Sequence, residues 1–444
     1  MKKIFIFILI VAFQANAQTL QGAFPQLKNS ELVLKGYDGF EEKELGTTTS
    51  DSLGNFSVPY PKNYRGAALL QPKGVNGLIV LLNNENFQMH WEDMQDFKTL
   101  QYINSPENEA FAKSIDISQE AEQKLAGLKY LLPQYAIPSN EYTWLTQEII
   151  TQENRFSHFL KTLPAASYAT YYLPIRKLII DMPLTANRYI ERLPQHEKDF
   201  AAINFNDDRL WASGLLGELL DGFYQLMESH LEIEKVTEHC NRSTDAWIKS
   251  LADNPTKQQA VAEHVFKWLE KRSLFPAAEY LAKAMLNQPH CELTEKNANL
   301  FEQYRKIGIG NRASNISLEN KQDRTKNKDL KNINSSYKLV VFGASWCPNC
   351  QTDFPKWKEN YAALKEKYDL EIVYISIDTD EKVFEEYYKE TPFITFCDYK
   401  GWETQAAKAY YVFATPTYIL LDKDLKVLAK LQSPEHLQAW LESK

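Results

Sequence analysis

Two cysteines separated by two residues, Cys347 and Cys350, constrain the fold of this 444-residue chain more than any other feature. The preceding run, 338–343, is a short apolar stretch typical of a buried strand, and the following run, 351–370, has the apolar spacing of a helix. The pair is therefore expected at a helix start, where unpaired N–H groups and the helix dipole favour a thiolate. Because a thiolate attacks disulfides, the pattern predicts exchange chemistry and a redox disulfide between Cys347 and Cys350.

A Cys-x-x-Cys pair is also half of many zinc sites. Zinc would need a second pair of ligands, and the remaining cysteines, Cys240, Cys291 and Cys397, form no second pair of this spacing. We therefore expect no metal and no cofactor, with zinc as the less favoured alternative. Cys240 and Cys291 are candidates for a second disulfide, whereas Cys397 is expected to be a buried free thiol.

The N-terminus has the layout of a secretory signal peptide. Two lysines precede the apolar run 4–13, and small residues around Ala17 supply a cleavage site. The apolar run is too short to cross a bilayer comfortably, which disfavours an uncleaved anchor. We expect an exported protein, soluble after cleavage near Ala17 and most simply periplasmic, in a compartment where disulfides persist.

The chain is long enough for two or three domains. Strand-like pieces at 31–34, 55–58, 67–70 and 77–82, divided by turn signals, predict an all-β, sandwich-like domain over 18–104. A helix start at Ser105-Pro106 opens an α-helical region over 105–308, with amphipathic blocks at 141–161, 166–193, 207–232, 244–251, 256–270 and 276–287.

Strands and helices alternate over 309–444, the pattern of an α/β domain. Strands are expected at 338–343, 371–377, 418–421 and 426–429, and helices at 350–368, 381–389 and 434–442. The polar stretch 311–337 is a linker or a hairpin leading into this domain.

Several short motifs in 310–444 resemble the TlpA/ResA group of exported thioredoxin-like proteins. The resemblance rests on the run Phe342–Cys347, on Asp353 and Pro355 after the second cysteine, on Ile375–Asp378, and on Thr415-Pro416-Thr417. It implies a thioredoxin fold in which Thr415 and a cis Pro416 face the cysteines and bind substrate, and in which Pro355 bends the helix. Residues 18–110 more weakly resemble the β-domain that precedes such modules in multi-domain exported bacterial proteins.

Thioredoxin has a buried aspartate six residues before the first cysteine, and here that position is Val341. Asp353 is therefore the candidate for proton transfer to Cys350, the alternative being a solvated carboxylate near a helix start. We expect Cys347 to be the exposed nucleophile, Cys350 the buried resolving thiol, and Trp346 part of the docking surface. Between the cysteines, Pro348 suits a first helical turn and Asn349 is neutral, which favours a moderately reducing pair.

The chain is thus expected to be a periplasmic thiol–disulfide oxidoreductase acting on protein substrates, as a reductant supplied by a membrane electron donor. One alternative is a disulfide isomerase, and another is a binding protein whose redox module is regulatory. The net charge of −8 and the lack of a basic stripe make nucleic acid an unexpected partner.

Overall fold

The chain forms two compact units, residues 1–232 and 233–444. The computed structural model describes residues 17–230, 233–272, 274–288, 293–318, 329–412 and 414–443. The predicted signal peptide, apart from Ala17, and Cys291 lie outside these residues, so its cleavage and the Cys240–Cys291 disulfide stay predictions. No helix in the described part of the chain is both long and apolar enough to span a bilayer.

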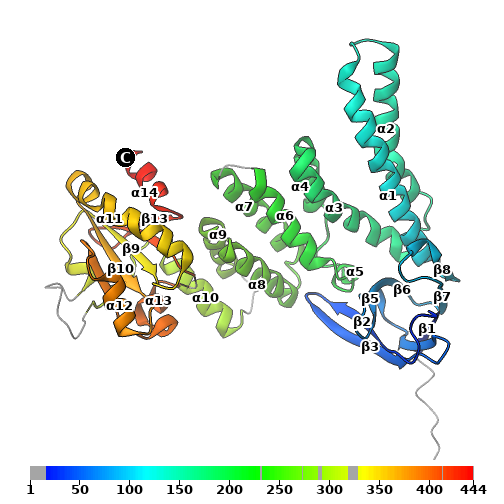
Figure 1. Ribbon diagram of the computed structural model, residues 1–444, viewed down its shortest axis with the longest axis horizontal. Coiled ribbons are helices and arrows are strands. Elements are labelled where there is room, and N and C mark those ends of the chain that lie inside the picture. The colour runs from blue at the N-terminus through cyan, green and yellow to red at the C-terminus, as the bar shows by residue number, and fades with distance from the viewer. Residues whose placement is uncertain are drawn as a thin grey trace, which may run out of the picture. The chain divides into compact units, whose positions relative to one another are not determined.

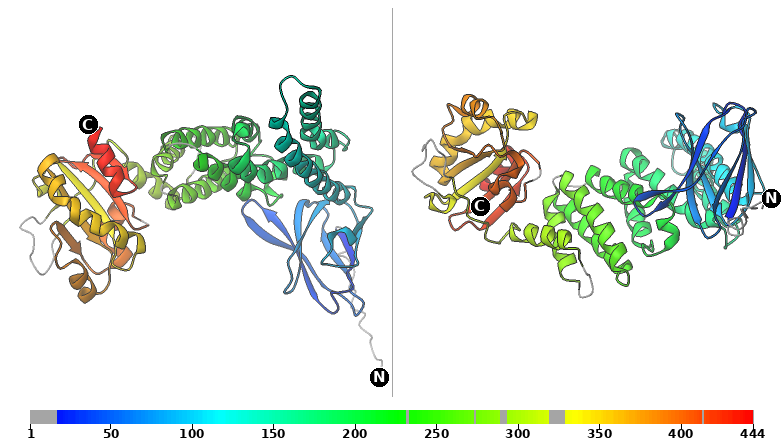
Figure 2. Two further views of the ribbon diagram at one scale, coloured as in Figure 1. Left: turned by 45° about the horizontal axis from the view of Figure 1, so that its top comes forward. Right: turned by 90° about the horizontal axis from the view of Figure 1, so that it is seen from below.

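Two four-stranded sheets form the N-terminal part of the first unit (Figures 1 and 2). Their strand orders are β4-β1-β7-β8 and β3-β2-β5-β6. The core between them comes from period-two alternation, as in β4, where Phe56, Val58 and Tyr60 are buried and the residues between them are exposed. The strands are β1 (Ala17–Ala23), β2 (Glu31–Asp38), β3 (Glu41–Thr49), β4 (Asn55–Pro61), β5 (Arg65–Pro72), β6 (Leu78–Asn83), β7 (Phe87–Trp91) and β8 (Leu100–Ile103).

Helices complete the first unit, and a long hairpin of α1 and α2 projects from the sheets (Figure 1). Buried polar residues anchor its base. The side-chain amide of Asn108 exchanges two hydrogen bonds with the backbone of Leu81 in β6, and the carboxylate of Glu107 accepts from the N–H groups of Tyr168 and Ala169 at the start of α3. The helices are α1 (Pro106–Leu131), α2 (Asn140–Leu160), α3 (Tyr168–Arg188), α4 (Leu193–Ala201), α5 (Asp208–Trp211) and α6 (Leu216–His230).

The second unit begins with a helical part and ends with a part built on a five-stranded sheet. The helices are α7 (Ile233–Ser250), α8 (Pro255–Lys271), α9 (Phe275–Leu286) and α10 (Glu295–Lys306). The C-terminal part contains β9 (Tyr337–Gly343), α11 (Pro348–Tyr368), β10 (Leu370–Ser376), α12 (Glu381–Tyr388), β11 (Ile394–Cys397), α13 (Gln405–Ala409), β12 (Thr417–Asp422), β13 (Val427–Leu431) and α14 (Pro434–Glu442).

The five-stranded sheet has the order β11-β10-β9-β12-β13, with β9, β10 and β11 parallel and β12 and β13 antiparallel. It is buried on both faces (Figure 2). Leu339 and Val341 of β9 belong to the core cluster that includes residues of α11 and α14, while Val340 and Phe342 belong to the cluster on the other face. Because β9 is the middle strand, its C-terminal end carries the cysteine loop at the centre of the sheet edge.

The expected fold class is confirmed: N-terminal sheets, a central helical region and a C-terminal α/β thioredoxin-like domain. The predicted helix start at Ser105-Pro106 is correct, since α1 begins at Pro106. The predicted amphipathic block 207–232 contains two helices, because α5 ends at Trp211 and Gly214, with φ of 71°, precedes α6. The sequence analysis missed β1, β3, β7 and β8, and among the helices α4, α10 and α13.

Candidate active site

Cys347 occupies the N-cap position of α11. Its sulfur accepts a hydrogen bond from the backbone N–H of Cys350 at 3.3 Å, and its thiol donates to the carbonyl oxygen of Thr415, also at 3.3 Å. The first contact follows from the local sequence, because Pro348 suits the first helical position and the Cys350 N–H, in the first turn, has no acceptor within the helix. The Cys347 sulfur therefore lies at the positive end of a 21-residue helix.

Both thiols are reduced and both are largely buried, together with Ala344 and Ile377. Cys347 is 5% exposed and Cys350 is 2% exposed, so Cys347 is less open than the sequence analysis expected. Cys350 is distinguished by its pKa. Burial raises the pKa of the Cys350 thiol to about 12, and the hydrogen bond with Cys347 is the second cause.

The loop facing the cysteines contains the expected cis peptide bond, Thr415–Pro416. The carbonyl oxygen of Thr415 accepts the hydrogen bond from the Cys347 thiol. Next in the chain, β12 pairs antiparallel with β9, and Thr417 lies opposite Phe342. This register brings a loop 68 residues away in sequence to within hydrogen-bond distance of Cys347.

Asp353 lies one helical turn beyond Cys350. Its carboxylate accepts a hydrogen bond from the Tyr418 hydroxyl at 2.7 Å and pairs with Lys356 at 3.2 Å. Lys356 also pairs with Glu435 at 2.8 Å. Burial, with the Asp353 carboxylate as the next cause, raises the pKa of Tyr418 well above its usual range. Proton transfer between Asp353 and Cys350 stays a prediction, and Tyr418 is a neighbour of this carboxylate that the sequence analysis did not identify.

Asp378 is the main site residue whose role the sequence analysis missed. Its buried carboxylate accepts hydrogen bonds from the backbone N–H of Ser345 at 3.1–3.2 Å, from the Ser345 hydroxyl at 2.7 Å and from the Ser376 hydroxyl at 2.6 Å. The amide of Gln351 holds the other side of the loop through the Ser345 carbonyl, at 2.7 Å. Asp378 could have been found from its position just after the predicted strand 371–377. The C-terminal ends of parallel strands share one edge of the sheet, so this residue is expected near the cysteine loop.

The other expected site residues lie on or near α11. Trp346 is 56% exposed directly before Cys347, where a docking surface is expected. Pro348 and Asn349 form the first turn of α11, and Pro355 lies inside the helix. In the described residues no cluster of three or more His, Cys, Asp or Glu side chains forms a potential metal site.

The third cysteine of this domain, Cys397, is buried at the end of β11. Its thiol donates to the backbone carbonyl of Asp378 at 3.2 Å, and burial raises its pKa to about 11. It is a reduced thiol, as the sequence analysis expected.

The C-terminal domain is similar in sequence to known thioredoxin-like proteins. A family model described as thioredoxin-like matches residues 334–427. A thiol-disulfide oxidoreductase ResA of Bacillus cereus is 30% identical over 147 residues, which are 32% of this chain and 82% of ResA. A nucleoredoxin of Danio rerio is 33% identical over 95 residues, and the match spans only 22% of its length. A crystal structure of a thioredoxin-like protein from Bacteroides caccae aligns with a TM-score of 0.41 at 17% identity, covering 56% of this chain and 93% of that chain.

Fold and site together define a thioredoxin-like disulfide-exchange domain in residues 334–427. The match to ResA is more specific, since it extends over most of that protein. The chain belongs to the thioredoxin-like thiol–disulfide oxidoreductases of the ResA type, with about 300 residues of further structure before the shared domain.

Proposed function

We propose that this protein is a periplasmic enzyme that reduces disulfides in protein substrates through Cys347 and Cys350. The observation that carries the proposal is the arrangement of the two sulfurs. Cys347 lies at a helix N-terminus and faces the cis-proline loop, while Cys350 lies behind it with a strongly raised pKa.

In the proposed reaction, the Cys347 thiolate attacks one sulfur of a substrate disulfide and forms a mixed disulfide, and the other substrate sulfur leaves and takes up a proton. Cys350 then loses its proton and attacks the Cys347 sulfur, which releases the second substrate thiol. The protein dithiol becomes the Cys347–Cys350 disulfide, and two electrons and two protons pass to the substrate. A dithiol protein in the membrane would return the enzyme to its reduced form.

The residues between the cysteines support the proposed direction of transfer. Strong disulfide oxidants owe their potential to a stabilised reduced form in which the nucleophilic thiol is acidic. Here the nucleophile is Cys347, and the neutral Asn349 between the cysteines adds no charge that would stabilise its thiolate. The dithiol is therefore expected to donate electrons.

Equilibration with glutathione buffers tests the direction. We expect a potential at or below about −220 mV, and a value near the −120 mV of the strongest periplasmic oxidant would refute the reductant assignment. The exported location, which the signal-like residues 1–17 support, is tested by osmotic-shock fractionation and by N-terminal sequencing.

Trapping identifies the substrates. In a Cys350→Ala chain the mixed disulfide on Cys347 cannot be resolved, so covalent adducts with substrate proteins should accumulate and disappear on reduction. A Cys347→Ser chain is the matched control and should form none. If both variants gave the same adducts, Cys347 would not be the nucleophile.

A further inference from the structure

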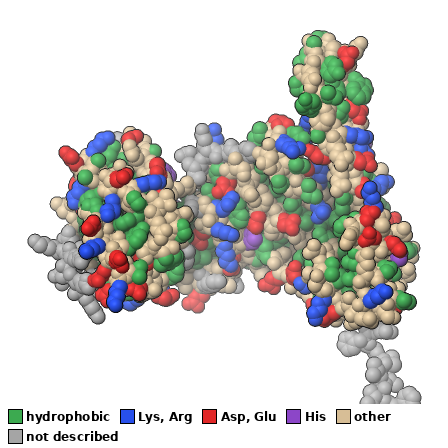
Figure 3. Space-filling model, viewed as in Figure 1, with side chains coloured by type: hydrophobic (Ala, Val, Ile, Leu, Met, Phe, Trp, Pro, Cys, Tyr) green, Lys and Arg blue, Asp and Glu red, His purple; other side chains and the backbone are tan. Residues whose placement is uncertain are grey.

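The tip of the α1–α2 hairpin carries an apolar surface that the cysteine site does not use. Tyr130, Ile137 and Trp144 are 75%, 74% and 63% exposed, and Leu131 and Tyr135 are also exposed. Residues 130–140 contain no charged side chain. The projecting hairpin is visible in Figure 1, and apolar side chains gather at its tip in Figure 3. An exposed apolar surface of this kind marks an interaction site.

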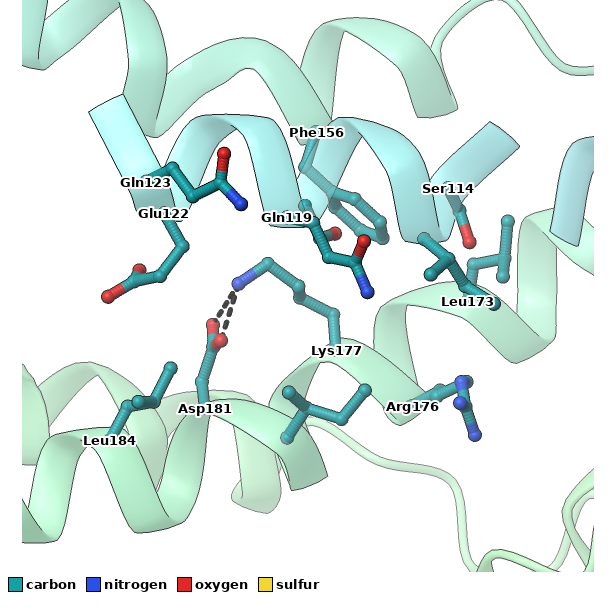
Figure 4. Close-up of a pocket in the computed structure, with 13 residues that line it drawn as sticks. Ser114, Gln119, Glu122, Gln123, Phe156, Leu173, Arg176, Lys177, Asp181 and Leu184 are labelled. Carbon is teal, nitrogen blue, oxygen red and sulfur yellow. Dashed lines mark hydrogen bonds and ion pairs between the residues drawn. The ribbon is translucent and has the colours of Figure 1, made fainter. Parts of the chain in front are cut away.

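A cavity of about 650 Å³ lies at the base of the same hairpin, between α1 and α3. Phe156 of α2 and Leu173 of α3 contribute apolar walls, while Lys177 and Asp181 form an ion pair inside it (Figure 4). Glu122 and Arg176 also line the cavity, so its two carboxylates and two cationic groups sum to zero formal charge and give no net preference for a charged ligand.

One face of α1 connects the cavity to the tip. We call it the α1 track, and it consists of Ile115, Gln119, Gln123, Ala126 and Tyr130, all exposed. At 100° per residue the last four lie within about 60° of one another, and at 1.5 Å per residue the track is about 22 Å long. It carries no charge. Ala126 contributes a small, exposed side chain between Gln123 and Tyr130.

Gln119 and Gln123 present unused hydrogen-bonding groups on this track. Their side-chain amides have no hydrogen-bond partner among the described residues. Both residues line the cavity between α1 and α3, and Figure 4 shows the Gln119 amide directed toward Lys177 of α3. Residues four apart on a helix are about 5–6 Å apart, close to the roughly 6.6 Å between alternate residues of an extended chain. Each amide can donate to a carbonyl and accept from an N–H group.

We propose that the α1–α2 hairpin binds an extended, uncharged segment of an unfolded polypeptide along the α1 track. The two glutamines hydrogen-bond to its backbone, and the cavity wall and the apolar tip take its side chains. About seven residues of extended chain cover the track, at roughly 3.3 Å per residue. A lipid surface fits less well, because a bilayer would leave both the cavity and the amides of Gln119 and Gln123 unused.

This inference rests on the proposed function for one point, that the bound chain is a substrate of the cysteines. Unfolded chains with incorrect disulfides are the protein substrates that expose uncharged apolar segments. Binding itself can be measured without any thiol chemistry.

The test uses the full chain and fluorescein-labelled α-lactalbumin that has been reduced and capped with iodoacetamide. This probe is permanently unfolded and has no free thiol or disulfide. Fluorescence anisotropy should show binding, and Ala126→Glu, which places a charge in the middle of the track, should weaken it at least tenfold. Gln147→Glu puts the same charge on an exposed site of α2 and should change the affinity less than twofold.

The outcomes separate the two proposals. A Cys347→Ser chain that binds the probe normally but does not reduce insulin is expected, because binding and redox chemistry use different residues. Equal affinity of Ala126→Glu and wild type, or no binding by wild type, overturns the inference and leaves the redox proposal intact. If a Tyr130→Ser/Ile137→Ser/Trp144→Ser chain lost binding to phosphatidylcholine vesicles but kept probe binding, the tip would be a lipid anchor and the inference would be wrong.

Discussion

The buried carboxylate of Asp378 fixes the backbone just before the cysteines, because both the N–H and the hydroxyl of Ser345 donate to it. Asp378→Asn keeps the size but replaces one acceptor oxygen by an NH₂ group, which opposes those donors. We expect a loss of about 1–3 kcal/mol in the free energy of unfolding and at least a tenfold fall in kcat/KM for disulfide reduction. Urea denaturation and insulin reduction measure the two effects.

Ser345→Ala is the matched control for this prediction. It removes the hydroxyl donor at 2.7 Å and keeps the backbone donor, so it should have a clearly smaller effect on both measurements. If Ser345→Ala impaired activity as much as Asp378→Asn, the serine hydroxyl rather than the carboxylate would hold the loop.

The second prediction at this scale concerns the reactivity of Cys350. Its pKa is raised to about 12, so the reactive thiolate is scarce at pH 8. Its fraction increases about tenfold for each unit by which the pH is raised toward the pKa. In the folded Cys347→Ser chain, alkylation of Cys350 by iodoacetamide should be slow at pH 8 and accelerate steadily up to pH 10. Peptide mass spectrometry identifies the site, and a rate that levels off below pH 9 would contradict the prediction.

At the scale of elements, β9 depends on Gly343 at its C-terminal end. A Cβ atom there would lie 2.0 Å from the Tyr374 hydroxyl and 2.5 Å from its ring. Gly343→Ala should therefore cost about 1–3 kcal/mol in the free energy of unfolding. Gly127, exposed near the C-terminal end of α1, has nothing within 4 Å of such a Cβ, so Gly127→Ala should raise that free energy by up to about 1 kcal/mol. Similar urea midpoints for the two variants would refute the steric argument.

The packing of α8, α9 and α10 against β13 buries opposite charges. Lys430 of β13 lies 3.8 Å from the Glu279 carboxylate and 4.2 Å from the centre of the Tyr304 ring, and burial lowers its pKa to about 8. Burial raises the pKa of Glu270 in α8 to about 7, with Lys430 opposing the shift. The folded protein thus holds the Glu270 proton more tightly than the unfolded chain does.

The contribution of protonated Glu270 to the free energy of unfolding is fully present below pH 4.5 and is lost as the pH rises through 7. At roughly 1.36 kcal/mol per pKa unit, the loss from Glu270 amounts to about 3 kcal/mol. Glu270→Gln should remove this fall and increase the free energy of unfolding at pH 8, by less than the full amount because Lys430 loses an opposite charge. Urea denaturation at pH 5, 6, 7 and 8 tests this, and an unchanged slope in the variant would show that another group titrates there.

The elements also show what the sequence can and cannot predict. The strand, the cysteine pair and the helix are contiguous, so their order and the position of Cys347 at the helix start followed from local patterns alone. The Asp378–Ser345 contact depends on the register that places Ser376 opposite Gly343, 33 residues apart, which no local pattern contains. The low exposure of Cys347 likewise depends on Thr415, which reaches it through the pairing of β12 with β9.

At the scale of the whole molecule, the chain divides into two compact units, and the core of each sheet belongs to one of them. The clusters on both faces of the five-stranded sheet consist of residues from the second unit, and the core between the N-terminal sheets consists of residues from the first. The sequence predicted the class of each region from its hydrophobic period. It did not predict which helices pack with which sheet, because that choice is made by buried contacts such as Glu107 with the start of α3.

The division into two units allows the contribution of the first unit to be measured directly. A chain of residues 233–444 contains both cysteines and their loop contacts, so it should fold and reduce a small disulfide such as hydroxyethyl disulfide within twofold of the full chain. It lacks the α1 track, so its kcat/KM for an unfolded, disulfide-bonded protein should fall at least tenfold. The full-length Ala126→Glu chain should show the same selective loss, because both changes remove the binding of the chain and leave the sulfur chemistry untouched. Equal losses on the small and the large substrate would instead mean that the first unit supports the folding of the second.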